Sequence, residues 1–207
     1  MPGPVTEIQA AVTFLRSRKV TVLITSALAL AVGELTVPAE AIELPIPGRA
    51  TVAVYLLPLL IATTWVACVA PPSPDLERFL PGRVMRLRRC GWYLLATALW
   101  VGAAGGTLAA RFHTPLAGAV PARSALIGIA LATASALVLP TRMAWLPPMT
   151  ITLAIWLYGT TDLQGTPTWW AVPLHPADSL PVAAATVLGW VIAGTIYVLV
   201  DARPLAD

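Results

Sequence analysis

The sequence predicts an all-α integral membrane protein with six transmembrane helices in a single domain, residues 1–207. Hydrophobic residues make up 57% of the chain and charged residues only 11%, whereas a soluble domain carries roughly 25% charged residues. The apolar residues form continuous runs of helical length, which favours helices over the alternating pattern of a β-barrel. Arginines cluster between these runs, as in the cytoplasmic loops of membrane proteins.

The first predicted element is an amphipathic helix over residues 4–19. Apolar side chains recur at helical spacing along one side, at Val5, Ile8, Val12 and Leu15. Thr6 with Gln9 fits a capping box at the start of this helix. We expect the helix to lie in the membrane interface, with its basic end at the lipid headgroups. The alternative is an extension of the first spanning helix.

Six apolar segments follow, each long enough to cross a hydrocarbon core of about 30 Å at about 1.5 Å per residue. Their predicted bounds are 20–37, 50–70, 90–110, 124–141, 143–161 and 179–200. Pro140 and Arg142 separate the fourth segment from the fifth. Because the combined run is too long for one span, we expect a tight helical hairpin there. Glu34 lies near the outer end of the first segment, and we expect its side chain to reach the water outside.

The basic residues predict the orientation. With the N-terminus inside, the cytoplasmic side carries Arg16, Arg18, Lys19, Arg78, Arg83, Arg86, Arg88, Arg89, Arg142 and Arg203. The outer side then carries only Arg49, Arg111 and Arg123. This bias places both termini in the cytoplasm. Arginine is far commoner than lysine, and alanine and proline are abundant, which is typical of a GC-rich bacterial genome. We therefore expect a multi-pass protein of the bacterial cytoplasmic (inner) membrane.

The loop from 73 to 89 combines a capped helix with a basic one. Its first residues suit a helix N-terminus: Ser73, Pro74, Asp75 and Glu77. Pro81 and Gly82 then stop that helix, and a second helix, RVMRLRRC, continues into the third span. A short capped helix in a cytoplasmic loop could be gripped by a soluble partner. The alternative is an ordinary connector that only fixes the topology.

The last outer loop, residues 162–181, is rich in proline and carries Trp169 and Trp170. Tryptophans favour the membrane interface, and prolines end helical turns. We expect two short helices there, either re-entrant or lying on the membrane surface.

The sequence contains none of the motifs expected of an enzyme with its own ATP or hydrolase site. There is no Walker A motif, no G-x-S-x-G and no H-E-x-x-H. His113 and His175 lie in outer loops, where we expect interfacial side chains; a haem role has little support. Cys68 and Cys90 would face a reducing compartment, so we expect no disulfide. No basic stripe is interleaved with aromatic residues, which argues against nucleic-acid binding.

The layout resembles the membrane-spanning subunit of a type-2 ABC exporter, the class of bacterial drug, antibiotic and polysaccharide efflux permeases. In that family an elbow helix precedes the first span, a coupling helix lies between the second and third spans, and short outer helices lie between the fifth and sixth. Residues 4–19, 74–89 and 162–181 hold these places, and LERFLPGRVMRLRRCGWYLL is similar to the family's coupling loop. The spans are shorter, and the chain smaller, than in typical members.

The resemblance implies a transport subunit that is not itself an enzyme and binds no cofactor. A separate ATPase would bind ATP and magnesium, and a second permease chain, identical or related, would complete the path for an amphipathic or lipophilic substrate. The implied ATPase contact consists of Asp75, Leu76, Glu77, Arg78, Phe79, Arg83 and Arg86. We expect an apolar substrate cavity with a few hydroxyls, such as those of Thr97, Thr133, Ser135 and Thr152.

Three other functions fit the same sequence. A six-helix substrate-binding subunit of a vitamin importer has a similar length and small residues in its spans. A membrane enzyme or cofactor-handling protein has only the two histidines in its favour. A membrane assembly or immunity factor would not alter substrate flux when the 73–89 loop is changed.

Overall fold

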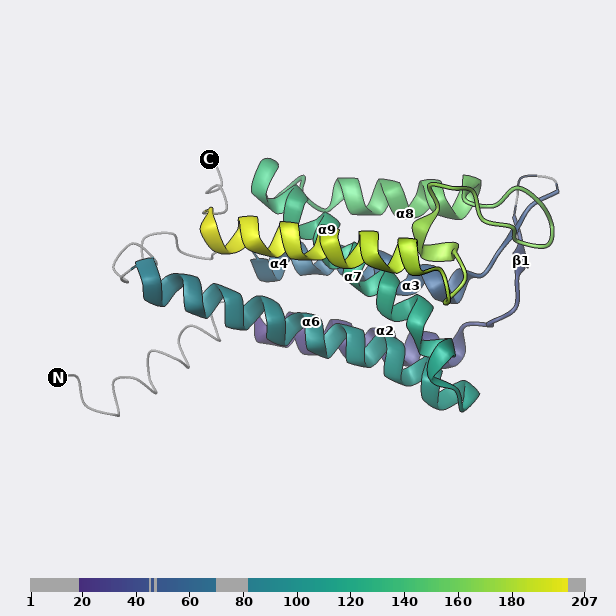
Figure 1. Ribbon diagram of the computed structural model, residues 1–207, viewed down its shortest axis with the longest axis horizontal. Helices are drawn as coiled ribbons and strands as arrows, with labels where there is room; N and C mark the ends of the chain where they lie inside the picture. The colour runs from purple at the N-terminus through teal and green to yellow at the C-terminus, as the bar shows by residue number, and fades with distance from the viewer. Residues whose placement is uncertain (1–18, 45, 47, 70–81, 201–207) are drawn as a thin grey trace.

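The computed structural model describes residues 19–44, 46, 48–69 and 82–200, which form a mostly helical bundle (Figure 1). The predicted elbow helix, apart from Lys19, lies outside the described residues. The same is true of residues 73–81, which include the predicted contact residues Asp75 to Phe79.

The helices and strands have the following bounds. The α-helices are α2 (Val20–Thr36), α3 (Leu57–Ile61), α4 (Trp65–Val69), α6 (Gly82–Phe112), α7 (Pro115–Val138), α8 (Leu146–Tyr158) and α9 (Leu180–Leu199). The 3-10 helices are η1 (Ala53–Leu56), η2 (Ala62–Thr64) and η3 (Val172–Leu174). Two short antiparallel strands, β1 (Ile42–Glu43) and β2 (Ala50–Thr51), pair Ile42 with Thr51 and Glu43 with Ala50.

Three of the described helices are long and apolar enough to cross a membrane. They are Arg83–Phe112 within α6, Pro115–Val138 and Leu180–Leu199. Three shorter apolar helical stretches accompany them: Val20–Thr36, Ala53–Val69 and Leu146–Tyr158. Their outer faces carry many exposed leucine, isoleucine and valine side chains, a surface that suits lipid rather than water.

The helices lie side by side along the long axis of the molecule, and the chain runs back and forth between two ends (Figure 1). At one end, which we call the hairpin end, the β1–β2 hairpin lies beside the loop that precedes α9. There the Ala50 amide donates to the Asp162 carbonyl at 3.2 Å. The opposite end, which we call the basic end, contains the starts of α2 and α6 and the turn between α7 and α8.

Charge divides between these two ends. The basic end carries Lys19, Arg83, Arg86, Arg88, Arg89 and Arg142. The acidic residues that the structure describes all lie toward the hairpin end: Glu34, Glu40, Glu43, Asp162 and Asp178. The molecule therefore presents one end that is purely cationic within the described chain and one end of mixed charge.

Several predicted segments agree closely with the helices. Segment 20–37 matches α2, segment 179–200 matches α9, and segment 143–161 contains α8. Segment 90–110 is the central part of α6, which begins at Gly82, so the prediction that the basic RVMRLRRC stretch continues into this helix is confirmed.

Segment 124–141 starts too late, because α7 begins at Pro115. Thr114 has extended backbone angles at the N-cap, and Pro115 occupies the first helical turn, where its missing N–H costs nothing. The predicted segment leaves Arg123 outside the span, yet Pro121 and Arg123 both lie inside this helix and are buried.

Segment 50–70 is not one continuous helix. Ala50 and Thr51 form strand β2, and the rest alternates between α-helix and 3-10 turns up to Val69. The hydroxyls of Thr63 and Thr64 donate to the carbonyls of Leu60 and Ile61, both at 2.8 Å. Such bonds to carbonyls one turn back compete with the regular ladder and favour tighter or bent turns.

The predicted pair of short helices in the last outer loop is not what the structure has there. Within residues 162–181 the structure has one 3-10 turn, η3, and an isolated bridge from Thr160 to Pro167. Asp162 shapes the turn before the bridge by accepting from the Thr166 amide at 2.9 Å and from the Thr166 hydroxyl at 2.7 Å. Prolines in this loop remove the amide donors that longer helices would need.

Candidate functional site

The first turns of α6 carry the two predicted contact residues that the structure describes. Arg83 and Arg86 are both exposed, and their spacing of three residues places them on one helical face. Met85 and Arg89, within the same turns, are buried instead. The structure therefore brings Arg83 and Arg86 onto one accessible surface at the basic end.

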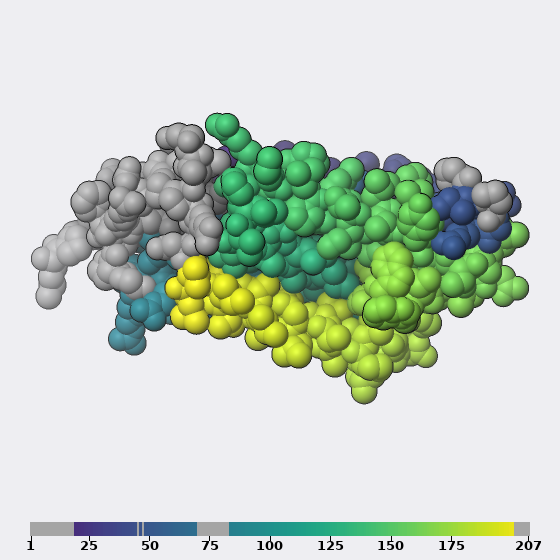
Figure 2. All heavy atoms as spheres, turned by 90° about the horizontal axis from the view of Figure 1, so that it is seen from above, coloured from purple at the N-terminus to yellow at the C-terminus, as the bar shows by residue number. Residues whose placement is uncertain are grey.

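Helix α6 is longer than the hydrocarbon core of a bilayer is thick. Its 31 residues span about 46 Å at about 1.5 Å per residue, against a hydrocarbon core of about 30 Å. Figure 2 shows its first turns, in teal-blue, extending past the end of α9, in yellow, away from the hairpin. The basic surface is thus one end of a long helix whose remaining turns pass through the bundle.

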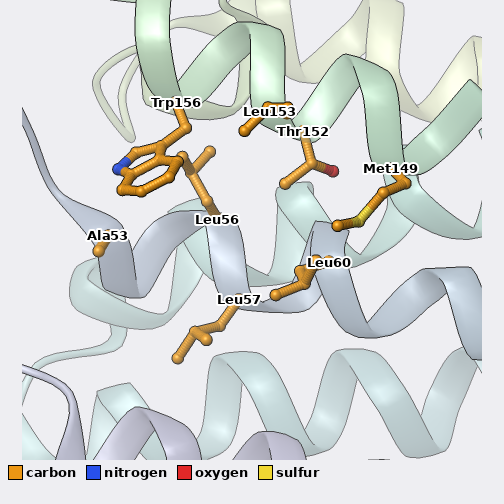
Figure 3. Close-up of a pocket in the computed structure, with 8 residues that line it drawn as sticks. All are labelled: Ala53, Leu56, Leu57, Leu60, Met149, Thr152, Leu153 and Trp156. Atoms are coloured by element: carbon orange, nitrogen blue, oxygen red, sulfur yellow. The ribbon is translucent and has the colours of Figure 1, made fainter. Parts of the chain in front are cut away.

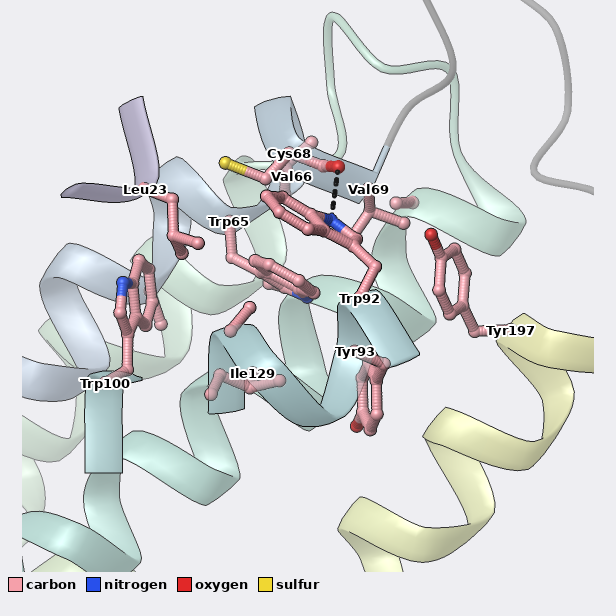
Figure 4. Packing of buried hydrophobic residues seen from close by; sticks show 14 of the residues in the cluster. Leu23, Trp65, Val66, Cys68, Val69, Trp92, Tyr93, Trp100, Ile129 and Tyr197 are labelled. Atoms are coloured by element: carbon pink, nitrogen blue, oxygen red, sulfur yellow. Dashed lines mark hydrogen bonds between the residues drawn. The ribbon is translucent and has the colours of Figure 1, made fainter. Parts of the chain in front are cut away.

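Aromatic side chains that follow the basic turns of α6 fix this helix to its neighbours (Figure 4). The Trp92 indole N–H donates to the Cys68 carbonyl of α4 at 3.2 Å. The Tyr93 hydroxyl donates to the Trp190 carbonyl of α9 at 3.1 Å, and the two rings stack with centroids 5.5 Å apart. Trp65 packs against both Trp92 and Tyr93. A displacement of the basic turns would therefore reach α4 and α9 directly.

The four hydroxyls predicted to line a cavity have different roles. Thr133 accepts from the Trp65 indole at 2.9 Å, and Thr97 accepts from the Trp190 indole at 3.2 Å, so both position aromatic rings. Ser135 donates to the Leu131 carbonyl of its own helix at 2.7 Å. Only Thr152 lines one of the pockets described below.

A pocket of about 270 Å³ lies between the broken helical stretch at η1 and α3 and helix α8 (Figure 3). Its lining is Ala53, Leu56, Leu57, Leu60, Met149, Thr152, Leu153 and Trp156. The Thr152 hydroxyl is already used, because it donates to the Pro148 carbonyl at 2.7 Å. The pocket thus offers an apolar surface without a free hydroxyl donor, which suits an alkyl or aromatic group.

Two further pockets of about 270 and 230 Å³ have similarly apolar linings. One lies between α6 and α9, beside Tyr93 and Trp190. The other lies between α7, η3 and α9, beside Leu131 and Thr186. The larger of the two adjoins the aromatic contacts that tie α6 to α9.

Arg123 holds the last outer loop onto the bundle. Its guanidinium donates to the carbonyl of Pro176 at 3.1 Å and to the carbonyl of His175. The ring Nε2 of His175 lies 3.1 Å from the Thr168 carbonyl within the same loop. Nearby, the amide and hydroxyl of Thr166 hold the pKa of Asp162 below its usual range by hydrogen bonding to the carboxylate.

Glu34 does not reach the water outside, and that prediction is wrong. Its side chain is 0% exposed, and neither carboxyl oxygen has a hydrogen-bond partner among the described residues. The nearby Arg111 guanidinium instead donates to the backbone carbonyls of Glu34 at 2.5 Å and Val37 at 3.0 Å, at the end of α2. Arginine commonly satisfies the last carbonyls of a helix in this way.

The two histidines and the two cysteines all lie among the described residues. No group of three or more metal-ligating side chains occurs in the part of the chain that the structure describes. His113 is exposed at the end of α6 with a left-handed backbone, φ 54°. Cys68 and Cys90 are both free thiols, and Cys68 is buried.

Sequence reasoning missed the roles of Arg111 and Arg123 as anchors of α2 and of the outer loop. The available signal was the placement of an arginine at or near the end of an apolar run, where backbone carbonyls gather. No family model, curated protein or solved structure matches the chain.

Proposed function

We propose that this chain is the transmembrane subunit of an ATP-driven exporter of the type-2 ABC class. It would span the bacterial inner membrane six times, with both termini in the cytoplasm. It would work as a pair of identical or related permease chains with a separate ATPase that binds ATP and magnesium. The substrate would be amphipathic or lipophilic, such as an antibiotic, a peptide or a lipid-like molecule.

The continuity of α6 is the observation that supports this proposal most. A single helix runs from the exposed Arg83 and Arg86 to Phe112 at the hairpin end. Within it, Trp92 and Tyr93 are bonded to α4 and α9. A push on the basic turns by a soluble motor would be carried into two other helices without a flexible joint, which is what a coupling segment requires.

The division of charge supports the orientation. Cytoplasmic segments of membrane proteins are rich in lysine and arginine, and the basic end fits that side. The three shorter helical stretches, α2, η1 to α4, and α8, would complete six crossings in a thin or locally thinned bilayer. The apolar pocket beside Thr152 and Trp156 would receive the hydrocarbon part of the substrate.

Co-purification with an ATPase tests the proposal. The chain carries a C-terminal tag and is expressed with an ABC ATPase encoded beside it. We expect the ATPase to be captured by the wild type and lost from a double variant, Glu77→Lys with Arg83→Glu. Arg142→Glu is the matched control, because Arg142 is exposed at the same end but lies in the turn between α7 and α8.

Two results would contradict the coupling role. In one, no ATPase is captured by the wild type. In the other, the double variant captures as much ATPase as the wild type, and the 73–89 loop then only fixes the topology. Capture of a vitamin instead of an ATPase would favour the importer alternative.

A further inference from the structure

Glu34 is an ionisable residue buried in an apolar part of the bundle. One turn earlier on the same helical face, Leu30 packs with Ala104 of α6 and Ala125 of α7. Next to Glu34, a Cβ atom on Gly33 would lie 3.3 Å from Leu57, so the start of α3 also presses on this part of α2. The carboxyl group of Glu34 thus lies on a helical face that is otherwise apolar.

The surroundings decide which form of the carboxyl group is stable. Neither oxygen has a hydrogen-bond donor among the described residues. An unpaired carboxylate in such a site would cost several kcal/mol or more, whereas the neutral acid carries no charge to desolvate. A metal cation would need several oxygen ligands, and no suitable group of side chains occurs within the described chain.

One cation lies close to Glu34 in the described structure. The elements packed most extensively against α2 are α6, α3, η2 and α4, and α3, η2 and α4 contain no charged residue. Within α6, the basic residues from Arg83 to Arg89 are about 33 Å or more away along the helix axis, at the opposite end. Arg111, whose guanidinium donates to the Glu34 carbonyl, is therefore the charged group of these elements that lies next to Glu34. Glu40, Glu43, Arg49 and His113 lie in the segments that follow α2 and α6 at the same end.

We propose that Glu34 is a proton-binding site inside the membrane, with Arg111 as the partner of its carboxylate after the proton leaves. The O–H bond breaks, the proton passes to water at the hairpin end, and the guanidinium stays charged. Arg111 then exchanges its bonds to the Glu34 and Val37 carbonyls for the carboxylate. This step would loosen the end of α2 and connect proton binding to the position of that helix.

Arg111 lies against the backbone of Glu34 itself. Arg111 already contacts the backbone carbonyl of Glu34 at 2.5 Å, so rotation of the Glu34 side chain about its own bonds can bring the carboxylate toward the guanidinium. Two alternative arrangements of one pair give the two-state element that a switch needs. The inference goes beyond the exporter proposal and does not require an ATPase.

Carbodiimide labelling tests this site on the purified full-length protein in lipid nanodiscs. Dicyclohexylcarbodiimide adds to protonated carboxyl groups in apolar surroundings, and intact-mass measurement reports the adduct. We expect one adduct in the wild type, its loss in Glu34→Gln, and a labelled fraction that falls as pH rises. Glu40→Gln is the matched control, because Glu40 is exposed near the same end, and it should label like the wild type.

Arg111 is tested in the same assay. Removing the cation in Arg111→Gln should move the fall in labelling to higher pH by about one unit or more, whereas Arg111→Lys should stay near the wild type. If Arg111→Gln does not fold, infrared spectroscopy still tests whether Glu34 binds a proton. The carbonyl stretch of a protonated carboxylic acid should be present in the wild type and absent in Glu34→Gln.

Three results would overturn the proposal. Folded wild-type protein could remain unlabelled at every pH and show no protonated-acid band. Labelling could be independent of pH. Folded Arg111→Gln could keep the wild-type pH profile, which would remove Arg111 as the partner. None of these measurements depends on ATPase capture, so failure here is separate from failure of the exporter proposal.

Discussion

The indole N–H of Trp65 donates to the hydroxyl of Thr133 at 2.9 Å, joining α4 to α7 in the centre of the bundle. Both side chains are fully buried. Trp65 also contacts the rings of Trp92, Tyr93 and Trp100, with centroid separations of 6.2 to 6.4 Å. One hydrogen bond thus fixes the ring on which the aromatic core of α6 is assembled.

Thr133→Val should lower the free energy of unfolding by about 1–3 kcal/mol, because it leaves the buried Trp65 donor without a partner while preserving side-chain shape. Denaturant unfolding in detergent, followed by tryptophan fluorescence, measures this change. Thr186→Val is the control: Thr186 is buried, but its hydroxyl donates only to the Val182 carbonyl of its own helix. Equal losses in both variants would contradict the cross-helix role of Thr133.

Gly118→Ala should separate α6 from α7 and lower stability by about 1–3 kcal/mol, as overpacking does. An added Cβ atom at Gly118 would collide with the Gly105 carbonyl oxygen and lie 2.9 Å from its carbon, and backbone atoms cannot move away cheaply. Gly106→Ala meets nothing within 4 Å and should be neutral or stabilising by up to about 1 kcal/mol. Thermal unfolding of the purified proteins compares the stability of the two variants. A Gly118→Ala variant as stable as the wild type would contradict the close contact between Gly118 and the Gly105 backbone.

Arg123→Gln should release the loop before α9. The guanidinium donates to carbonyls at Pro173, His175 and Pro176, and losing bonds of a charged donor costs about 1.5–3 kcal/mol. Amide exchange across residues 171–179 should accelerate about tenfold or more, with α6 unchanged. Arg49→Gln, at the same end, should leave that loop protected. Unaltered exchange in Arg123→Gln would show that other contacts hold the loop.

The turn at Asp162 should depend on acid pH. Hydrogen bonds from the amide and then the hydroxyl of Thr166 lower the pKa of Asp162. Since the folded pKa is lowered, the stabilisation is present above about pH 4, the ordinary range of aspartate, and is lost as pH falls through the lowered pKa. Carboxyl NMR titration should show this pKa rising in Thr166→Val. Thr161→Val, whose hydroxyl faces the Thr166 carbonyl instead, should leave it unchanged.

The sequence predicted well those elements that depend on local composition. Apolar runs matched α2 and α9 closely and contained the shorter α8, and Pro140 with Arg142 correctly marked the break between α7 and α8. The basic stretch before Cys90 was recognised as the beginning of α6. In each case the signal lies within the segment itself, as helical length, a proline or a run of arginines.

The elements that were missed depend on partners distant in sequence. Arg123 fits inside α7 because carbonyls more than 45 residues later surround its guanidinium. Glu34 is buried because α3 and α6 cover it, which its position near a span end did not indicate. The strands β1 and β2 are only two residues each, too short for any periodicity. Of the predicted ATPase contact, only Arg83 and Arg86 fall among the described residues; both are exposed on α6, and the contact itself stays a prediction.

The orientation of the bundle is the claim on which the exporter proposal depends most directly, and cysteine labelling measures it. The variants Arg86→Cys and Asp178→Cys are made after both native cysteines are replaced by alanine, since both sites are exposed, one at each end. A membrane-impermeant maleimide is applied to spheroplasts before and after permeabilisation. We predict immediate labelling of Asp178→Cys and labelling of Arg86→Cys only after permeabilisation. The reverse pattern, or labelling of both from outside, would contradict a cytoplasmic basic end and with it a coupling role for α6.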